Sequence, residues 1–136
     1  MNKTTILLTT WLALLLAACG AQATEEPGGN PLGGAVYISN YELLIMESYP
    51  VQVALWVEGD LPTPCHEFRY QYEIQNFGGT VRLDVVTYSY ADPATACAQV
   101  LQPFEHRISF DLTTGPEGDY EVYLDGELVG EFTYPG

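Results

Sequence analysis

Apolar and polar residues alternate at every second position over three long stretches of this chain, residues 51–58, 67–74 and 104–112. A period of two is that of a β-strand with one face buried and the other in water. The three stretches therefore predict three half-buried strands. Their predicted inward residues are Val51, Val53, Leu55 and Val57 in the first, Phe68, Tyr70, Tyr72 and Ile74 in the second, and Phe104, His106, Ile108, Phe110 and Leu112 in the third.

Less regular apolar runs at residues 35–39, 41–46 and 80–90, with a hairpin that ends the chain, bring the expected number of strands to seven or eight. Turns rich in glycine, proline and aspartate separate them, and only residues 93–100 could wind into a helical turn. Short strands at this spacing in about 100 residues are typical of β-sandwiches. The sequence predicts an all-β, antiparallel two-sheet sandwich over residues 35–136.

The final hairpin permits a prediction of register. A two-residue Asp-Gly turn at 125–126 would place Val122 opposite Val129, and the apolar residues of the two strands would then lie on opposite faces. A three-residue loop at 124–126, with a left-handed glycine and a bulge, would pair Val122 with Leu128 and give one apolar face. We therefore expect the three-residue loop.

The first 18 residues have the form of a secretory signal. Lys3 precedes an apolar run of about 13 residues, which is shorter than the roughly 20 residues of a membrane-spanning helix. The sequence Leu16-Ala17-Ala18-Cys19 resembles the lipobox of bacterial lipoproteins. The resemblance implies cleavage before Cys19, a diacylglyceryl group on its thiol and further acyl chains such as palmitate. It places the protein in the cell envelope, anchored outside the cytoplasm, and in the outer membrane where one exists. An ordinary signal peptide and an uncleaved anchor are the alternatives.

Residues 19–34 are rich in glycine and proline and lack apolar periodicity, so we expect a flexible tether with a span of roughly 20 Å. After removal of residues 1–18, three arginines and no lysine face eighteen acidic residues, a net charge of −15 with both histidines neutral. Such a charge repels phosphate backbones and anionic lipid, which excludes nucleic acid as a partner. Solubility explains the charge, with a salty medium or a basic partner as alternatives.

Two further cysteines remain once Cys19 is assigned to lipid. Cys65 and Cys97 form an even pair in an oxidising compartment, and we expect a disulfide between them. Because Cys65 opens a predicted strand and Cys97 lies in a predicted connection, the bond should tie a loop to a strand end. Metal binding by these cysteines with His66 and His106 is the alternative, but the close ligand spacing of zinc sites is missing.

The C-terminal sequence "GDYEVYLDGELVGEF" is similar to the G-x-Y-x-V-x-x-x-G ending of many exported bacterial immunoglobulin-like domains. The likeness implies an immunoglobulin-like sandwich with Tyr120 at the tyrosine-corner position. It does not extend to the tryptophan, since Trp56 precedes both cysteines and an immunoglobulin domain has this residue between them.

Motifs of catalysis are scarce. The sequence has no G-x-S-x-G, no H-E-x-x-H and no phosphate-binding glycine loop, and His106 falls on an apolar strand face, where a buried imidazole is expected. Calcium binding among Asp111, Glu117, Asp119 and Asp125 lacks the spacing of an EF-hand. We expect no enzyme, no cofactor and no metal.

Three aromatic residues are the candidates for a binding surface. Trp56 falls on the polar face of its strand, and Tyr88 and Tyr90 lie in the irregular run "VTYSYADP". Exposed amphipathic rings can stack on sugars or anchor a protein, although a covering layer could also explain them. The sequence therefore indicates a monomeric, lipid-anchored module that binds a protein or glycan or serves as an envelope component. The alternative is a small protease inhibitor that presents residues 61–64, or a loop near Pro93, rigidified by the disulfide.

Overall fold

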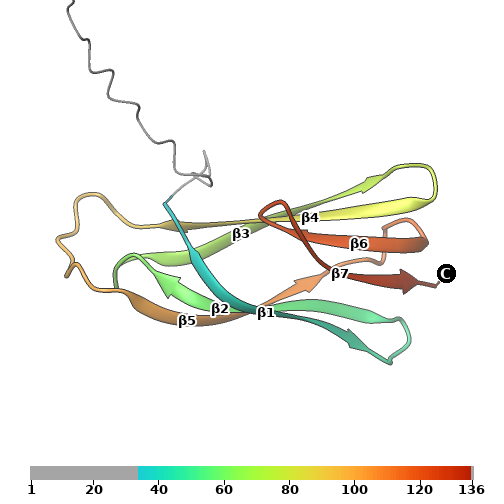
Figure 1. Ribbon diagram of the computed structural model, residues 1–136, viewed down its shortest axis with the longest axis horizontal. Helices are drawn as coiled ribbons and strands as arrows, with labels where there is room; N and C mark the ends of the chain where they lie inside the picture. Colours follow the sequence, from blue (N-terminus) through green and yellow to red (C-terminus); the bar gives the residue numbers. More distant parts are fainter. Residues whose placement is uncertain (1–33, 136) are drawn as a thin grey trace, which may run out of the picture.

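The computed structural model describes residues 34–135, which form two β-sheets packed face to face (Figure 1). One sheet has the strand order β1-β2-β5 and the other the order β3-β4-β6-β7. The strands are β1 (Tyr37–Met46), β2 (Gln52–Leu61), β3 (Glu67–Asn76), β4 (Thr80–Tyr90), β5 (Gln102–Phe110), β6 (Gly118–Leu124) and β7 (Glu127–Tyr134). This arrangement confirms the predicted all-β sandwich. The predicted signal peptide, Cys19 and the tether up to residue 33 lie outside the described residues.

The core lies between the two sheets and is built from the inward rows that the period-two pattern predicts. Leu55 on β2 and Ile108 on β5 have no exposed surface. Burying an aliphatic side chain of this size stabilises the fold by about 1.5–3 kcal/mol. On β3 the inward row is only half-buried, and it packs on β5, with the ring centroids of Phe68 and Phe104 4.7 Å apart. The alternation therefore located the inward faces of all three strands.

The two runs predicted at residues 35–39 and 41–46 form a single strand, β1, with a bulge. Its register with β2 passes from Ile38 opposite Gly59 to Asn40 opposite Glu58. The strand backbones approach closely there, because a Cβ atom on Gly59 would lie 2.1 Å from the Tyr37 carbonyl oxygen. The absence of a side chain at Gly59 is what permits this bulge.

The prediction of a helical turn at residues 93–100 is wrong. This segment belongs to the connection between β4 and β5, which contains turns and bends but no helix. Nearly all of its residues are exposed. A short helix depends on the packing of an apolar face, and this connection offers none.

The position of β4 distinguishes this sandwich from an immunoglobulin domain. In the constant-type immunoglobulin fold, the fourth strand is the edge of the sheet that holds the first, second and fifth strands. Here β4 lies in the other sheet, between β3 and β6, and it pairs in parallel with β6 over residues 80–85. The expectation of entirely antiparallel sheets is therefore wrong for this one pair, while the other six strands keep the immunoglobulin grouping.

Tyr120 has the tyrosine-corner geometry that the C-terminal likeness implies. Its side chain is fully buried at the start of β6, and its hydroxyl donates a hydrogen bond of 2.6 Å to the carbonyl oxygen of Pro116. The ring stacks on Phe132 at a centroid distance of 4.8 Å. Burial, and secondarily the nearby Tyr134, raises the pKa of the Tyr120 hydroxyl. The residue thus fixes the chain where it enters the four-stranded sheet.

The predicted three-residue loop between β6 and β7 is wrong. Leu124 pairs with Glu127 across a two-residue turn, in which Asp125 and Gly126 have positive φ angles of 49° and 89°. These values are those of the type I′ turn that Asp-Gly favours. The register shift that restores one apolar face occurs instead further along β7, where Val129 is the extra residue. A register shift was needed to bring the apolar residues to one face, but it lies within β7 and not in the turn.

Asp125 completes the hydrogen bonding of β4 beyond the end of β6. The Asp125 amide donates to the carbonyl oxygen of Val85, and its carboxylate accepts the Thr87 amide at 2.8 Å and the Thr87 hydroxyl at 2.6 Å. Two residues later, Gly34 and Ser89 exchange backbone hydrogen bonds of 2.8 and 3.0 Å. The free side of β4 is therefore occupied first by a side chain and then by the start of the described chain.

The predicted disulfide between Cys65 and Cys97 is confirmed, with a Cα–Cα distance of 6.0 Å. It joins the connection between β2 and β3 to the connection between β4 and β5, so Cys65 does not open a strand as predicted but lies two residues before β3. Closing a loop of this length stabilises a chain by about 3.5 kcal/mol in the chain-entropy treatment. The long, exposed β4–β5 connection is thereby held at one end of the sandwich.

We predict that Tyr120→Phe lowers the free energy of unfolding by about 1 kcal/mol at neutral pH, because the bond to Pro116 is lost. A raised pKa in the folded state also implies that Tyr120 contributes fully below the unfolded pKa of about 10, and that this contribution is lost as pH rises through the folded pKa. Urea denaturation between pH 7 and 11 should therefore show less alkaline destabilisation in the variant. Identical pH profiles would contradict this role.

We predict that Thr87→Val lowers the free energy of unfolding by about 1–2 kcal/mol, since it removes a buried donor to the Asp125 carboxylate. Thr133→Val is the matched control, because Thr133 donates to Asp119 at 2.7 Å in an exposed pair. That change should cost less than about 0.5 kcal/mol. Equal losses of unfolding free energy for the two variants in urea denaturation would show that the Asp125 contact stabilises the fold no more than the exposed pair does.

Candidate binding surfaces

Trp56 lies on the outer face of the three-stranded sheet. Its neighbours along β2, Leu55 and Val57, point into the core, so the indole points away from it. In register it stands between Glu42 on β1 and Arg107 on β5. The side chain is half-buried within this face. Its sequence-predicted position on the outward side of the strand is thus observed.

Tyr88 and Tyr90 lie on the outer face of the four-stranded sheet. They alternate along β4 with Thr87 and Ser89, whose side chains are buried (5% and 1% exposed). Tyr90 is 55% exposed, and Tyr88 is half-buried with its hydroxyl 3.4 Å from the side-chain amide of Gln71 on β3. These tyrosines therefore form one line along β4, on the side away from the core.

The structure brings Tyr88 and Tyr90 together but does not place Trp56 with them. The two sheets pack with their inner faces against each other, so their outer faces point in opposite directions (Figure 1). A ligand that contacts the two tyrosines cannot at the same time contact Trp56. The three residues of the sequence-based surface thus divide into two separate candidate surfaces.

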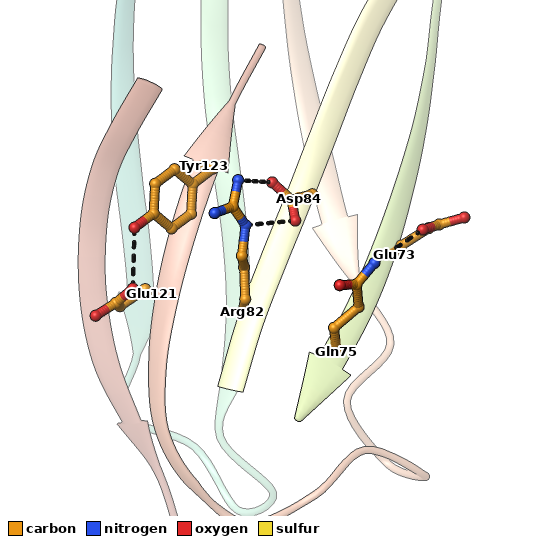
Figure 2. A network of polar contacts seen from close by, with 6 residues as sticks. All are labelled: Glu73, Gln75, Arg82, Asp84, Glu121 and Tyr123. Carbon is orange, nitrogen blue, oxygen red and sulfur yellow. Dashed lines mark hydrogen bonds and ion pairs between the residues drawn. The ribbon is translucent and has the colours of Figure 1, made fainter. Parts of the chain in front are cut away.

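Beside the tyrosine line lies a polar cluster that the sequence analysis did not identify (Figure 2). Arg82 donates two hydrogen bonds, of 2.6 and 2.7 Å, to the carboxylate of Asp84. Its guanidinium carbon lies 3.9 Å from the centroid of the Tyr123 ring, and the Tyr123 hydroxyl donates to Glu121 at 3.0 Å. The signal was the alternation itself, since these residues occupy the outward positions of β4 and β6.

The charge of Arg82 in this cluster is paired within its own strand, and the carboxylate of Glu121 leaves the cluster with a net negative charge. The hydrogen bonds to Asp84 raise the pKa of the Arg82 guanidinium above its ordinary value. The hydrogen bond to Glu121 likewise raises the pKa of the Tyr123 hydroxyl. Planar bidentate pairing and an aromatic ring under the guanidinium orient Arg82 in the plane of the face. The cluster is therefore a fixed polar surface rather than a set of free charges.

Shallow hollows lie at the two ends of the tyrosine-bearing face. One, of about 160 Å³, is lined by Cys65, Glu67, Tyr90, Asp92 and Thr95. The other, of about 300 Å³, is lined by Phe77, Thr80, Arg82 and Glu121. Both are open at the surface and smaller than or at the lower limit of typical small-molecule sites. Neither hollow is thus an enclosed small-molecule site.

The histidines and cysteines considered for catalysis or metal binding have structural surroundings. His106 is half-buried, with its ring 5.0 Å from that of Phe68 and 5.5 Å from that of Tyr70. The His66 Nδ1 lies 2.8 Å from the Thr63 hydroxyl oxygen, and both thiols are in the disulfide. Within residues 34–135, no three His, Cys, Asp or Glu side chains are arranged to hold a metal ion.

The acidic residues considered for calcium do not converge either. The Asp111 carboxylate accepts hydrogen bonds from the hydroxyl and amide of Thr113, which lower the pKa of Asp111. Asp119 accepts from Thr133, and Asp125 accepts from Thr87. Asp111 is thus engaged within its own turn, Asp119 across the β6–β7 pair and Asp125 with β4, each with a different threonine. In the described part of the chain, no helix is long and apolar enough to cross a membrane.

The two loops considered for protease inhibition differ in accessibility. At residues 61–64, Leu61 and Thr63 are each 5% exposed, and the Thr63 carbonyl oxygen accepts the His66 amide. That segment is packed into the fold and does not protrude. Residues 91–101 are mostly exposed, with Val100 and Leu101 more than half accessible. Of these two segments, only residues 91–101 are largely exposed.

Comparison with known proteins agrees with this architecture. The profile of the ORF11 beta-sandwich domain matches residues 55–134, from the middle of β2 to the end of β7. No curated protein and no solved structure gives a significant match to the chain. Because the profile covers more than half of the 136 residues, the chain belongs to the ORF11 beta-sandwich domain family.

Proposed function

We propose that this protein is a lipid-anchored, non-enzymatic module of the cell envelope that binds a glycan or protein through the outer face of its four-stranded sheet. The observation that carries the proposal is the line of Tyr88 and Tyr90 on β4, with Tyr90 more than half exposed. Amphipathic rings on a flat face supply contact area at low entropic cost, and their hydroxyls satisfy polar partners. The hydrogen-bonding groups of Gln71 and Arg82 lie on the same face.

Charge restricts the class of ligand. The mature chain has a net charge of −15, and two of its three arginines, Arg69 and Arg82, are paired with carboxylates of their own strands. A polyanionic glycan would meet repulsion without a free cationic group on this face to offset it. A neutral or amino-substituted glycan, or a basic protein segment, fits the face better.

The lipobox resemblance at Cys19 supports a lipid anchor. The place where the described chain begins indicates where on the domain the tether would attach. Gly34 pairs with Ser89 near the end of β4, next to Tyr90 and to the connection that carries the disulfide. The tether would therefore attach at the Tyr90 end of the sandwich. The opposite end, with the β1–β2 and β3–β4 turns, would face away from the membrane (Figure 1).

Protease inhibition is the second candidate, and one observation favours it. The β4–β5 connection is exposed over most of residues 91–101 and is tied to the fold at Cys97. Restraint of an exposed loop reduces the entropy lost when it enters a protease. A stable complex with a protease that disappears on reduction of the disulfide would favour this function over glycan binding.

We predict that intact-mass spectrometry of the chain taken from native membranes shows Cys19 as the first residue, with a mass increase that corresponds to acyl chains. Two alkylations should appear only after reduction, because Cys65 and Cys97 are joined. Cys19→Ala is the control and should remove both the added mass and the membrane association. A mature chain without acyl groups would contradict the anchor.

We predict that Tyr88→Ala and Tyr90→Ala each weaken retention on the recognised glycan of an array about tenfold, since each removes a stacking ring worth about 1.4 kcal/mol. Tyr88→Phe should retain most of the affinity. Trp56→Ala, on the opposite face, is the matched control and should bind like the unmodified chain. Loss of binding in the Trp56 variant alone would assign the ligand to the three-stranded sheet instead.

A further inference from the structure

The edge strand β3 has few of the features that usually prevent edge strands from pairing with another chain. Natural sheets protect their edges with charged side chains, prolines, bulges or short strands, and of these β3 has only the charges of Glu67, Arg69 and Glu73. The edge strand β1 has a bulge after Ile38, β5 contains Pro103, and β7 combines a bulge with Gly130. By contrast, β3 is ten residues long without proline, glycine or bulge, and it pairs with β4 without interruption.

The inward row of β3 is incompletely covered. Phe68, Tyr70, Tyr72 and Ile74 pack against the core but are only half-buried, whereas the equivalent rows of β2 and β4 are almost fully buried. The edge strands β5 and β7 also have a neighbour on one side only, yet Ile108 and Phe132 on them are buried, so edge position alone does not account for the exposure of this row. A second strand along this edge would remove further apolar surface from water.

The outward row of β3 has an order of charges that is complementary to itself in the antiparallel direction. This row reads Glu67, Arg69, Gln71, Glu73 and Gln75. Antiparallel pairing centred on Gln71 sets Arg69 of each copy opposite Glu73 of the other. The Arg69 and Glu67 side chains are 53% and 66% exposed, so the ion pair between them contributes little stability. Arg69 can therefore leave Glu67 for a carboxylate of a second chain.

We propose that two copies of this chain associate through antiparallel pairing of β3 with β3, with Gln71 facing Gln71 across a twofold axis. The same register sets Tyr70 opposite Tyr72 twice and Phe68 opposite Ile74 twice, so the inward row forms aromatic and apolar cross-strand pairs. A twofold interface requires that each patch be complementary to itself, and β3 meets this requirement on both faces. The two four-stranded sheets then become one continuous sheet.

Neighbouring registers are less favourable. Side chains keep to their own face only when the register shifts by two residues. A shift that centres the pairing on Tyr70 places Glu67 opposite Glu73 twice, which is repulsive. A shift that centres it on Tyr72 separates Arg69 from Glu73 and leaves no opposite-charge pair. The charges of β3 therefore select the register centred on Gln71.

The association would join the tyrosine-bearing faces of two copies. The two β4 strands would be separated by both β3 strands, at a distance of about 14 Å from the usual strand spacing. Two lines of Tyr88 and Tyr90 would then lie on one continuous surface. This consequence for ligand binding rests on the proposed function, whereas the pairing of β3 does not.

The test is the oligomeric state of charge-reversed variants. We expect the full chain, in a density-matched detergent, to show a dimer that increases with concentration in sedimentation equilibrium. Arg69→Glu or Glu73→Arg alone places like charges opposite each other twice, and each should raise the dissociation constant about 30-fold. An equimolar mixture of the two variants restores both opposite-charge pairs and should dimerise again. Arg107→Glu, on the other sheet, is the matched control and should dimerise like the unmodified chain.

A covalent trap tests the register independently of affinity. Gln71→Cys should form an intermolecular disulfide under mild oxidation, because position 71 faces itself across the axis. Gln75→Cys should not, since position 75 faces Glu67 of the second copy. A chain that stays monomeric at every concentration, or a mixture of the two charge variants that fails to reassociate, would overturn the proposal. Equal cross-linking of the two cysteine variants would overturn the register.

Discussion

The hydrogen bonding of β4 is the constraint on which the arrangement of this sandwich depends. β4 is longer than the strand beside it, since β6 pairs with it only as far as Val85. A strand buried between others cannot leave amide groups unpaired without a large cost. The Asp125 carboxylate and Gly34 take over at Thr87 and Ser89. The β6–β7 turn and the start of the described chain are thus both fixed by the needs of one strand.

The position of β4 also sets the topology apart from that of an immunoglobulin domain. β4 leaves the place that a fourth strand has in an immunoglobulin domain and lies between β3 and β6. β3 is thereby separated from β6 and remains an edge strand. The position of β4 also turns Tyr88 and Tyr90 toward solvent within the outer face of the four-stranded sheet.

Surface charge and surface aromatic residues both bear on which ligands this protein could bind. The strong negative charge disfavours anionic ligands, and under the proposed function the aromatic rings and paired polar groups would make the contacts with a ligand. The side chain of Arg82 on the four-stranded sheet is held by its ion pair with Asp84 and by the ring of Tyr123. Repetition of this face by a second copy would raise the strength of binding through multivalency, without new contacts in either copy.

The sequence by itself determined the sandwich class, the inward rows of β2, β3 and β5 and the Cys65–Cys97 bond, because each of these depends on local periodicity or on residue chemistry. The place of Tyr120 came from the resemblance of the C-terminal sequence to immunoglobulin-like domains. Alternation also put Trp56 on an outward position, whereas Tyr88 and Tyr90 lie in a run too irregular for the pattern to place them. Alternation carries no information about which sheet a strand joins. Tertiary structure decided that Trp56 faces away from the tyrosines, that β4 pairs in parallel with β6, and that the bulge of β7 follows the turn. The three-residue loop was predicted from the burial of apolar side chains alone. The observed two-residue turn also brings the Asp125 carboxylate to Thr87. That contact joins residues 38 positions apart, and only the packed sheet reveals it.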